Sequence, residues 1–359
     1  MDFGLSEEQE LLQETLRDFV ARECPPARVR ERFEADGAHD PALWSAMAEV
    51  GLCGLCLPED CGGAQLELLD LALAAEVLGE GGVPGPFLGH ALAGLALLHA
   101  GSEEQRWRWL PRLASGEAIG SVALAEPDSA WEPERWAARL LEGRVGGAKR
   151  LVPHAAVADL IVVGLAGGGM ALVERGAEGL SVEPFAGVDG TRDLAGLCLD
   201  AVPAEALPGG SEAWPRLRDA GLVLLAADSF GSAWKLIRDT IDYLGTRRQF
   251  GTPLVQFQSV KHQLADLATE LEPARSLYWY AAHAFDHIPA EAERSAALAK
   301  AHITDRALHV AREVLELHGG IGFTWECDVH LWYKRAMWNR AFLGGPDHHR
   351  ERCARLAGW

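Results

Sequence analysis

Apolar side chains recur at helical spacing near the start of the chain. From Leu12 to Val20 they follow one another at intervals of four, three and one, which places them on one face of a helix. Ser6 precedes this segment, and Gln9 follows Ser6 by three positions, a capping-box pattern that marks the start of a helix. We therefore expect the chain to open with an amphipathic helix.

The spacing of apolar residues changes twice along the chain. Residues 66–80 and 87–101 are apolar at most positions, which is typical of helices buried on more than one side. Near Gly120 short apolar runs begin, and residues 158–176 hold two β-rich runs around a glycine-rich turn, which predicts a hairpin. Helical periodicity returns at about Ala213 and lasts nearly to the end. The order predicted is helices, a small β domain, then helices.

Composition and charge exclude several classes of function. The 359 residues carry a formal net charge of −19, from 33 basic and 52 acidic side chains. This charge argues against non-specific binding of nucleic acid and against an anionic membrane surface. No uninterrupted apolar run reaches the ~20 residues that a membrane span needs. The acidic N-terminus has no secretory pattern. We expect a cytoplasmic protein with no membrane or nucleic-acid partner.

Three of the seven cysteines cluster in one short stretch, at Cys53, Cys56 and Cys61. A C-x2-C pair can bind zinc or an iron–sulfur cluster, but no second ligand pair follows it in the sequence. We interpret the three as small apolar residues of a packed turn and expect no metal.

The segment from Arg247 to Ala268 joins two long helical stretches through a turn that contains Gly251 and Pro253. An arginine closes the first helix, and Gln258 lies near the start of the second. An arginine beside free backbone N–H groups at a helix start suits a pyrophosphate, although a charged surface turn has the same appearance.

A second segment ends a helix with three glycines, Gly319, Gly320 and Gly322. A helix C-cap accounts for one glycine, but not for three. Glycine lets the backbone approach a bulky ligand closely, so the extra glycines favour a binding role.

Together these segments resemble the acyl-CoA dehydrogenase family. The combination of R-x-Q-F-G-x-x-L-x-x-F-Q with H-G-G-x-G-F-T carries the resemblance, and "GLCGLCLPEDCGG" is similar to the family's G-x-x-G-x-x-x-P-E-x-x-G-G turn. The resemblance to the family extends over nearly the whole chain. It implies a helical N-terminal domain at 1–117, a middle β-barrel-like domain at 118–205, and a C-terminal four-helix bundle at 206–359.

The family resemblance also implies a chemistry. FAD lies across a subunit interface, an acyl-CoA thioester is dehydrogenated at its α and β carbons, and electrons leave through an electron-transferring flavoprotein. A carboxylate takes the α-proton, and the thioester carbonyl is polarised by hydrogen bonds. Carried over residue by residue, the implied FAD contacts are Arg247, Phe250, Gln258, Gly319, Gly320 and Gly322, with Leu124 and Ala125 beside the flavin ring.

Several positions depart from the family pattern. The family's T-E-P motif begins here with Ala125, so the threonine hydroxyl that would donate to the flavin is missing. The G-S-D motif that usually follows is absent from residues 128–136. Pro153 replaces the threonine of I-T-N, and proline also lacks an N–H. Glu316 replaces a glutamine, and a carboxylate beside a diphosphate is unfavourable unless a cation intervenes. We therefore expect FAD affinity below that of typical members.

Both positions at which family members carry the catalytic base are glycine here, Gly344 and Gly221. The nearby Asp347 and Asp219 are candidates to replace the base, although Asp347 also suits a helix N-cap.

The two histidines after Asp347, His348 and His349, are expected to be solvated residues of the last helix. Four interpretations stay open: an acyl-CoA dehydrogenase with a displaced base, a half-site subunit of a heteromer, a relative with other flavin chemistry, and a scaffold without FAD.

Overall fold

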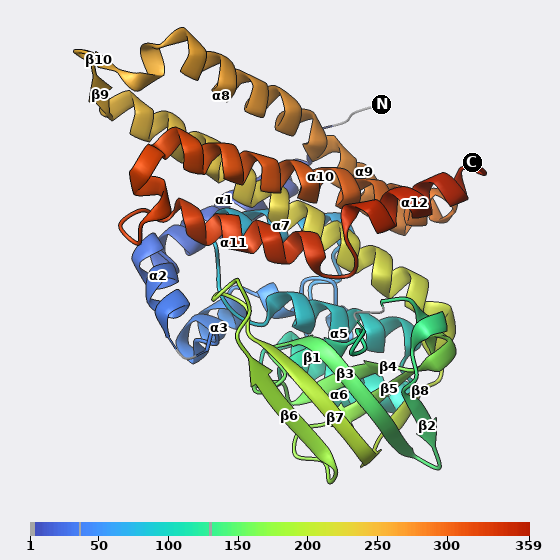
Figure 1. Cartoon of the computed structure of the whole chain (residues 1–359). Helices are drawn as coiled ribbons and strands as arrows, with labels where there is room; N and C mark the ends of the chain where they lie inside the picture. Colours follow the sequence, from blue (N-terminus) through green and yellow to red (C-terminus); the bar gives the residue numbers. More distant parts are fainter. Residues whose placement is uncertain (1–3, 36, 129–130) are drawn as a thin grey trace. The chain divides into compact units, whose positions relative to one another are not determined.

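The computed structural model describes residues 4–35, 37–128 and 131–359. Helices occupy both ends of the sequence and strands lie between them (Figure 1), which confirms the predicted fold class. The boundaries of the three predicted domains stay a prediction.

The chain divides into two compact units. One consists of residues 1–33, 72–83 and 222–359, and the other of residues 34–71 and 84–221. Each unit therefore combines segments that are far apart in the sequence.

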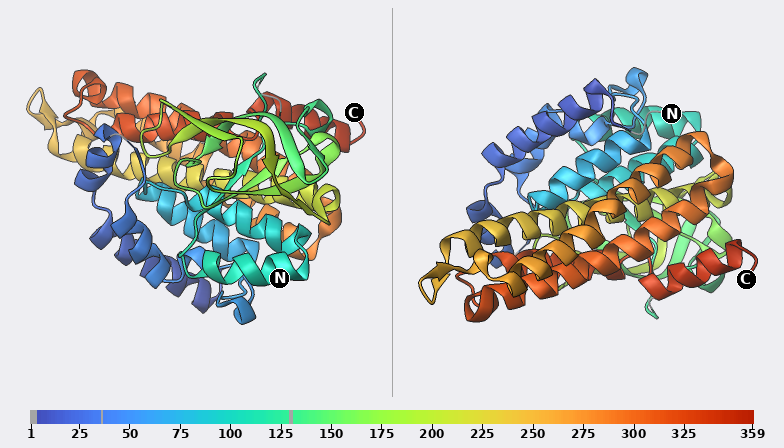
Figure 2. Two further views of the ribbon diagram at one scale, coloured as in Figure 1. Left: turned by 90° about the horizontal axis from the view of Figure 1, so that it is seen from below. Right: turned by 90° about the horizontal axis from the view of Figure 1, so that it is seen from above.

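The first unit is a helical bundle centred on one long helix. Its helices are α1 (Glu7–Glu23), α8 (Gln258–Leu271), α9 (Arg275–His287), α10 (Pro289–His318), α11 (Val329–Ala341) and α12 (Pro346–Leu356), and it shares α2 (Pro26–Glu34), α4 (Leu68–Glu80) and α7 (Gly210–Thr246) with the second unit. Helix α10 packs against α8, α9, α11 and α12, and Figure 2 shows α8 and α10 running side by side. The buried face of α10 is rich in alanine, which lets neighbouring helices approach closely.

The start of α1 forms as the sequence predicts. The backbone N–H of Gln9 donates to Ser6 Oγ at 3.2 Å, and the backbone N–H of Ser6 donates to Gln9 Oε1 at 3.1 Å. Leu16, Phe19 and Val20 on the apolar face are buried. The capping box and the amphipathic face are therefore both confirmed.

The second unit holds two four-stranded sheets (Figure 1). One has the order β1 (Gly120–Ala123), β4 (Leu160–Gly164), β5 (Met170–Glu174), β8 (Glu205–Leu207); the other has the order β2 (Arg139–Leu141), β3 (Arg144–Pro153), β7 (Leu194–Pro203), β6 (Leu180–Phe185). Among the described strands, β1 and β4 alone pair in parallel. Both sheets contribute to one core, which includes Val145, Ile161, Val163, Val173 and Leu197.

Strands β4 and β5 form the predicted hairpin. The turn between them contains Gly167 and Gly168, whose φ angles of +78° and +87° lie in the left-handed region. Residues with side chains rarely adopt that region, so the glycine-rich sequence follows from the turn geometry.

The helices of the second unit are α3 (Pro41–Glu49), α5 (Phe87–Ala100) and α6 (Glu103–Ala114). Helix α5 packs against β1 and α6, which explains its apolar sequence. The cysteine cluster lies in the packed turn after α3. Cys53 and Cys61 are buried there, and burial raises the pKa of the Cys53 thiol to about 12.

Helix α7 is long and apolar enough to cross a membrane by length and composition alone. However, 89% of its most apolar 18-residue window is buried inside the protein. Such burial is what the core helix of a globular protein shows.

Candidate functional site

The turn after α7 brings the predicted phosphate-binding residues onto one exposed hairpin. Arg247 is exposed at the end of α7, and the two-residue strands β9 (Arg248–Gln249) and β10 (Thr252–Pro253) pair behind it. Phe250 is 94% exposed at the tip, with a φ of +54°. Arg247 and Phe250 are therefore both open to an approaching molecule.

Gln258 is the first residue of α8, as expected for a helix start. The residue before it, Phe257, caps the helix without a side-chain hydrogen bond. The first N–H groups of a helix lack partners within the helix and carry part of its positive dipole. This end of α8, with Arg247 nearby in sequence, therefore has the donors that a phosphate requires.

The three glycines after α10 have different structural roles. Gly319 has a φ of +65° and ends the helix, with its N–H donating to the carbonyl of Glu316. Gly322 is buried, and a Cβ on it would lie 2.7 Å from the carbonyl oxygen of Leu315. Gly320 has no such restriction, because a Cβ added to it would meet nothing within 4 Å. The positive φ thus favours glycine at 319 and packing requires it at 322, whereas neither reason applies to Gly320.

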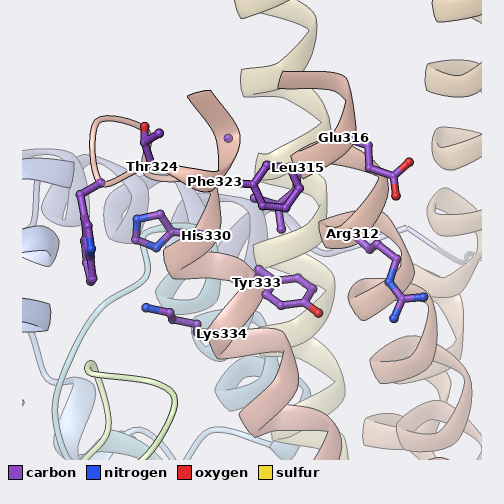
Figure 3. Close-up of a pocket in the computed structure, with 10 residues that line it drawn as sticks. Arg312, Leu315, Glu316, Phe323, Thr324, His330, Tyr333 and Lys334 are labelled. Atoms are coloured by element: carbon purple, nitrogen blue, oxygen red, sulfur yellow. The ribbon is translucent and has the colours of Figure 1, made fainter. Parts of the chain in front are cut away.

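Beside this turn a pocket opens between α10 and α11 (Figure 3). Its lining includes Gly322 and Glu316, so it brings the glycine turn together with the carboxylate that replaces the family's glutamine. Arg312, one helical turn before Glu316 on α10, lines the same pocket. Sequence reasoning missed this arginine, although its i, i+4 spacing from Glu316 on a predicted helix was a usable signal.

The stretch "FLGGPDHH" connects α11 to α12. Gly344 has a φ of +96°, and a Cβ there would lie 3.0 Å from Cδ2 of His348 and 3.2 Å from Nε2 of His349. Its neighbour Gly345 has a φ of −80°, with nothing within 4 Å of an added Cβ. Position 344 therefore suits glycine, and a glutamate there would strain the backbone.

Two buried groups hold this loop in place. His349 Nε2 is 2.9 Å from the carbonyl oxygen of Leu343, and Lys300 donates to the carbonyls of Asn339 and Arg340 at the end of α11. The expectation that His349 is solvated was wrong, because its side chain is 1% exposed, while His348 is exposed as predicted. Burial and the Lys300 charge lower the pKa of His349 to about 3, so the imidazole is neutral.

Neither aspartate candidate is placed as a base is expected to be. The side chain of Asp347 is 91% exposed and pairs with Arg350 at 2.7 Å. The N-cap of α12 is Gly345 and has no side-chain cap bond, so the alternative interpretation of Asp347 as the N-cap was wrong. Asp219 is buried and bound to Arg218 at 2.8 Å. Both carboxylates are engaged by arginines, and burial in addition closes Asp219 to a substrate.

The positions expected beside the flavin ring lie in the second unit. Leu124 and Ala125 follow β1 and are only 2% and 0% exposed, so neither residue presents accessible surface to a ligand in this chain. The carbonyl of Ala125 already accepts the N–H of Arg150 at 2.9 Å. The next residue, Glu126, accepts from buried Lys149 at 2.9 Å. Residues 129 and 130, within the segment that lacks G-S-D, lie outside the described residues.

Pro153, which replaces the family's threonine, ends β3 and pairs with Leu194 of β7. Its carbonyl accepts from the hydroxyl of Ser121. His154 follows with a φ of +50° and a side chain 2% exposed, 3.5 Å from Asp193. The segment is therefore integrated into the β structure and offers neither a hydroxyl nor an N–H at position 153.

Models of known families match both ends of the chain. The acyl-CoA dehydrogenase N-terminal domain matches residues 6–117, and the acyl-CoA dehydrogenase C-terminal domain matches residues 220–357. Together the two matches cover more than half of the chain. This chain belongs to the acyl-CoA dehydrogenase family.

Individual members of the family are similar over nearly the full length. Acyl-CoA dehydrogenase IpdE2 of Mycobacterium tuberculosis is 34% identical and matches 95% of this chain and 94% of its own. IpdE2 of Mycolicibacterium smegmatis is also 34% identical, with 98% of both chains covered. A variant of the Tcur3481–Tcur3483 steroid ACAD is a similar solved structure, with a TM-score of 0.90, 33% identity and 98% of each chain covered.

Membership makes this protein an oxidoreductase of the acyl-CoA dehydrogenase type, with FAD as cofactor and acyl-CoA thioesters as substrate class. The residues of this chain fit the diphosphate side of FAD better than its flavin-ring side. On the diphosphate side, the exposed Arg247, the uncapped start of α8 and the open Gly320 all suit the cofactor. On the flavin-ring side, Ala125 and Pro153 lack the donors that the family pattern supplies.

Within the first unit, the glycine turn and the base position lie at opposite ends of α11. The helix has 13 residues, which at 1.5 Å per residue separates its two ends by about 20 Å. The turn at Gly319 precedes this helix and Gly344 follows it. The two groups of predicted site residues are therefore not brought together around one point of this unit.

Proposed function

We propose that this acyl-CoA dehydrogenase works as one subunit of a heteromeric enzyme and contributes only part of a shared FAD site. It presents Arg247, Gln258 and Gly320 to the diphosphate of an FAD whose flavin ring is held by a partner chain of the same family. The partner supplies the carboxylate base in its own site. The similar solved structure named a Tcur3481–Tcur3483 steroid ACAD supports this proposal, because its name joins two chains, and it favours a steroid-like acyl-CoA as substrate.

The observation that carries the proposal is the geometry at Gly344. The family reaction removes the α-proton of the thioester to a carboxylate, and FAD, when bound, accepts the β-hydride. At position 344 the φ of +96° and the contacts of 3.0 Å and 3.2 Å to the following histidines oppose any side chain. The loss of the base is therefore built into the loop. Because general-base catalysis typically contributes about 10²–10⁴-fold, a site without it has little activity.

The interpretation with a displaced base receives less support from the structure. Asp347 faces solvent and is held by Arg350, which also bonds to Asp305 at 2.7 Å. The Asp347 carboxylate is therefore engaged by an arginine of its own helix.

The remaining finer assignments belong to the same proposal. They are the three domain boundaries at 1–117, 118–205 and 206–359, a cytoplasmic location, and an electron-transferring flavoprotein as the acceptor of electrons. The net charge of −19 supports the absence of nucleic-acid and membrane partners.

Co-expression tests the proposal directly. The chain is purified alone and together with a family member that carries glutamate at the position aligned with Gly344, and flavin content and acyl-CoA-dependent reduction of an artificial acceptor are measured with short-chain, long-chain and steroid acyl-CoAs. We expect a colourless, inactive chain alone, and a coloured, active complex with one FAD per two chains. Robust turnover by the chain alone that survives Asp347→Asn would refute the proposal.

A further inference from the structure

Two histidines and one carboxylate come together inside the second unit. His39 lies in the segment between α2 and α3, His154 follows β3, and Asp193 directly precedes β7. Nδ1 of His154 is 3.5 Å from Oδ2 of Asp193. His39 is close enough to both side chains for their charges to act on its own ring. The sequence places these three residues far apart, so only the fold forms this cluster.

The Asp193 carboxylate fastens the segment before α3 to the β structure. Its Oδ1 accepts the backbone N–H of Ala38 at 2.8 Å, and Ala38 is 0% exposed. Gly37 packs against the same carboxylate, because a Cβ on Gly37 would lie 3.7 Å from Oδ2. The backbone of Asp193 is itself fixed, since its carbonyl accepts the N–H of His154 at 3.0 Å. Residues 37 and 38 are therefore held by one charged side chain.

The two imidazole rings of the cluster are buried without hydrogen bonds. His154 is 2% exposed, and neither of its ring nitrogens has a hydrogen-bond partner among the described residues. Nδ1 of His39 is buried and, within the same described part of the chain, also has no partner. Native proteins pair most of their buried polar atoms, so three such nitrogens in one cluster call for an explanation. Because no hydrogen bond fixes the protonation of these rings, burial and the surrounding charges decide it.

The charges that act on His39 come from four neighbouring side chains. Burial has the largest effect and lowers the pKa of His39, and the charges of His154 and Arg175 lower it further. The carboxylates of Asp193 and Asp40 oppose this shift, but they do not cancel it. The folded segment thus favours the neutral ring of His39.

Two of these four side chains have other partners. Arg175 is 3.5 Å from Asp159, and Asp40 accepts backbone N–H groups at the start of α3 at 3.0 Å and 3.1 Å. Asp193 is therefore the carboxylate that serves both histidines. One carboxylate balances the charge of one imidazolium, but it cannot balance two.

We propose that residues 37–40 form an acid-released latch, which stays closed while the two histidines share at most one proton and opens when both are charged. The first imidazolium pairs with Asp193, whereas the second has no carboxylate of its own and repels the first in a buried place. Because the closed latch holds the pKa of His39 below its ordinary 6.5, the stability of the latch is fully present above pH 6.5 and is lost as pH falls below it. This latch lies within the second unit and does not depend on the proposed function.

Hydrogen exchange of the full chain tests the latch. The protection of a peptide that spans residues 37–40 is followed by mass spectrometry and corrected for the intrinsic pH dependence of amide exchange. Below pH 6.5 we expect the protection of the wild type to fall by up to about 10-fold per pH unit, because opening takes up one proton.

Four variants separate the roles of the charges. His39→Gln and His154→Gln should each remove most of this fall, because the cluster then never holds two imidazolium charges. Asp193→Asn should enlarge the fall, since the balancing charge is lost while an oxygen remains to accept from Ala38. His348→Gln changes an exposed histidine of α12 and is the matched control, which should follow the wild type.

Three results would overturn the latch. The first is protection of residues 37–40 that does not change with pH in the wild type. The second is a parallel loss of protection in the buried helix α5, which would show that acid unfolds the whole unit. The third is an equal fall in Asp193→Asn and His154→Gln, for which opposite changes are expected. This last comparison decides the question even where His39→Gln does not fold.

Discussion

At the scale of single residues, Gly344 and Gly345 are adjacent glycines with opposite requirements. Gly344 lies in the left-handed region and would place a Cβ against two histidines, whereas Gly345 is extended and open. The sequence has the same residue at both positions, and only the backbone conformation distinguishes them.

The two glycines can be compared with the same substitution. Gly344→Ser should lower the free energy of unfolding by about 1–3 kcal/mol, the usual cost of a side chain in a strained backbone region. Gly345→Ser should change it by less than about 0.5 kcal/mol or raise it, because serine is a preferred N-cap and Gly345 caps α12. Urea unfolding measures both, and equal effects would contradict the backbone argument.

His349 should make the protein sensitive to acid. Its pKa falls from the ordinary 6.5 to about 3, so the folded state holds the neutral ring. The stability that the neutral ring contributes is present above pH 6.5 and is lost as pH falls toward 3. Between about pH 6 and 4 the unfolding free energy of the wild type should fall by about 1.4 kcal/mol per pH unit relative to His349→Gln. Parallel pH profiles would show that His349 titrates normally.

At the scale of elements, α7 and α11 are joined by a buried ion pair. Arg335 Nε and a terminal guanidinium nitrogen bond to the two carboxylate oxygens of Asp228 at 3.0 Å and 2.6 Å. The Asn339 amide donates to the same carboxylate at 2.6 Å, and Arg335 also donates to the carbonyl of Val83 at 3.0 Å. This network fixes α11, and with Lys300 at the end of that helix it sets the position of the Gly344 loop.

Removal of one partner of this pair should be costly. Arg335→Met leaves the carboxylate of Asp228 buried and uncompensated, which should lower stability by about 3–5 kcal/mol in urea unfolding. Adding Asp228→Asn should restore part of the loss. Arg340→Met, which breaks the more exposed pair with Asp305 at 3.3 Å, should cost less than about 1 kcal/mol. Similar losses in the two single variants would argue against a buried clamp.

At the scale of the whole molecule, the two groups of predicted site residues differ in how closely they follow the family pattern. The residues predicted to meet the diphosphate, such as Arg247 and Gln258, are exposed, while the positions predicted for the flavin ring and the base carry alanine, proline and glycine. A chain that keeps one half of a shared site and loses the other is expected to work in an assembly.

Flavin content of the co-expressed complex tests this division. Arg247→Ala should weaken FAD binding about 10-fold, through loss of a charge-assisted contact to phosphate, without loss of the partner chain during purification. Arg294→Ala serves as the control. Full flavin retention in the Arg247 variant would remove this arginine from the cofactor site.

The order of elements, the capping box at Ser6, the hairpin at 158–176 and the family are all predictable from the sequence alone. These depend on short-range periodicity, turn chemistry and motif spacing, all of which are local. It also predicts that both base positions are glycine, at Gly344 and Gly221, and this assignment stays a prediction.

The surroundings of those positions, by contrast, follow only from the folded structure. The burial of His349, the strain at Gly344, the solvent exposure of Asp347 and the pocket at Arg312 all depend on how the folded chain packs around them. A histidine in a polar C-terminal helix looks solvated in sequence until Leu343 and Lys300 enclose it. Burial and φ angles arise from packing, which no local pattern encodes.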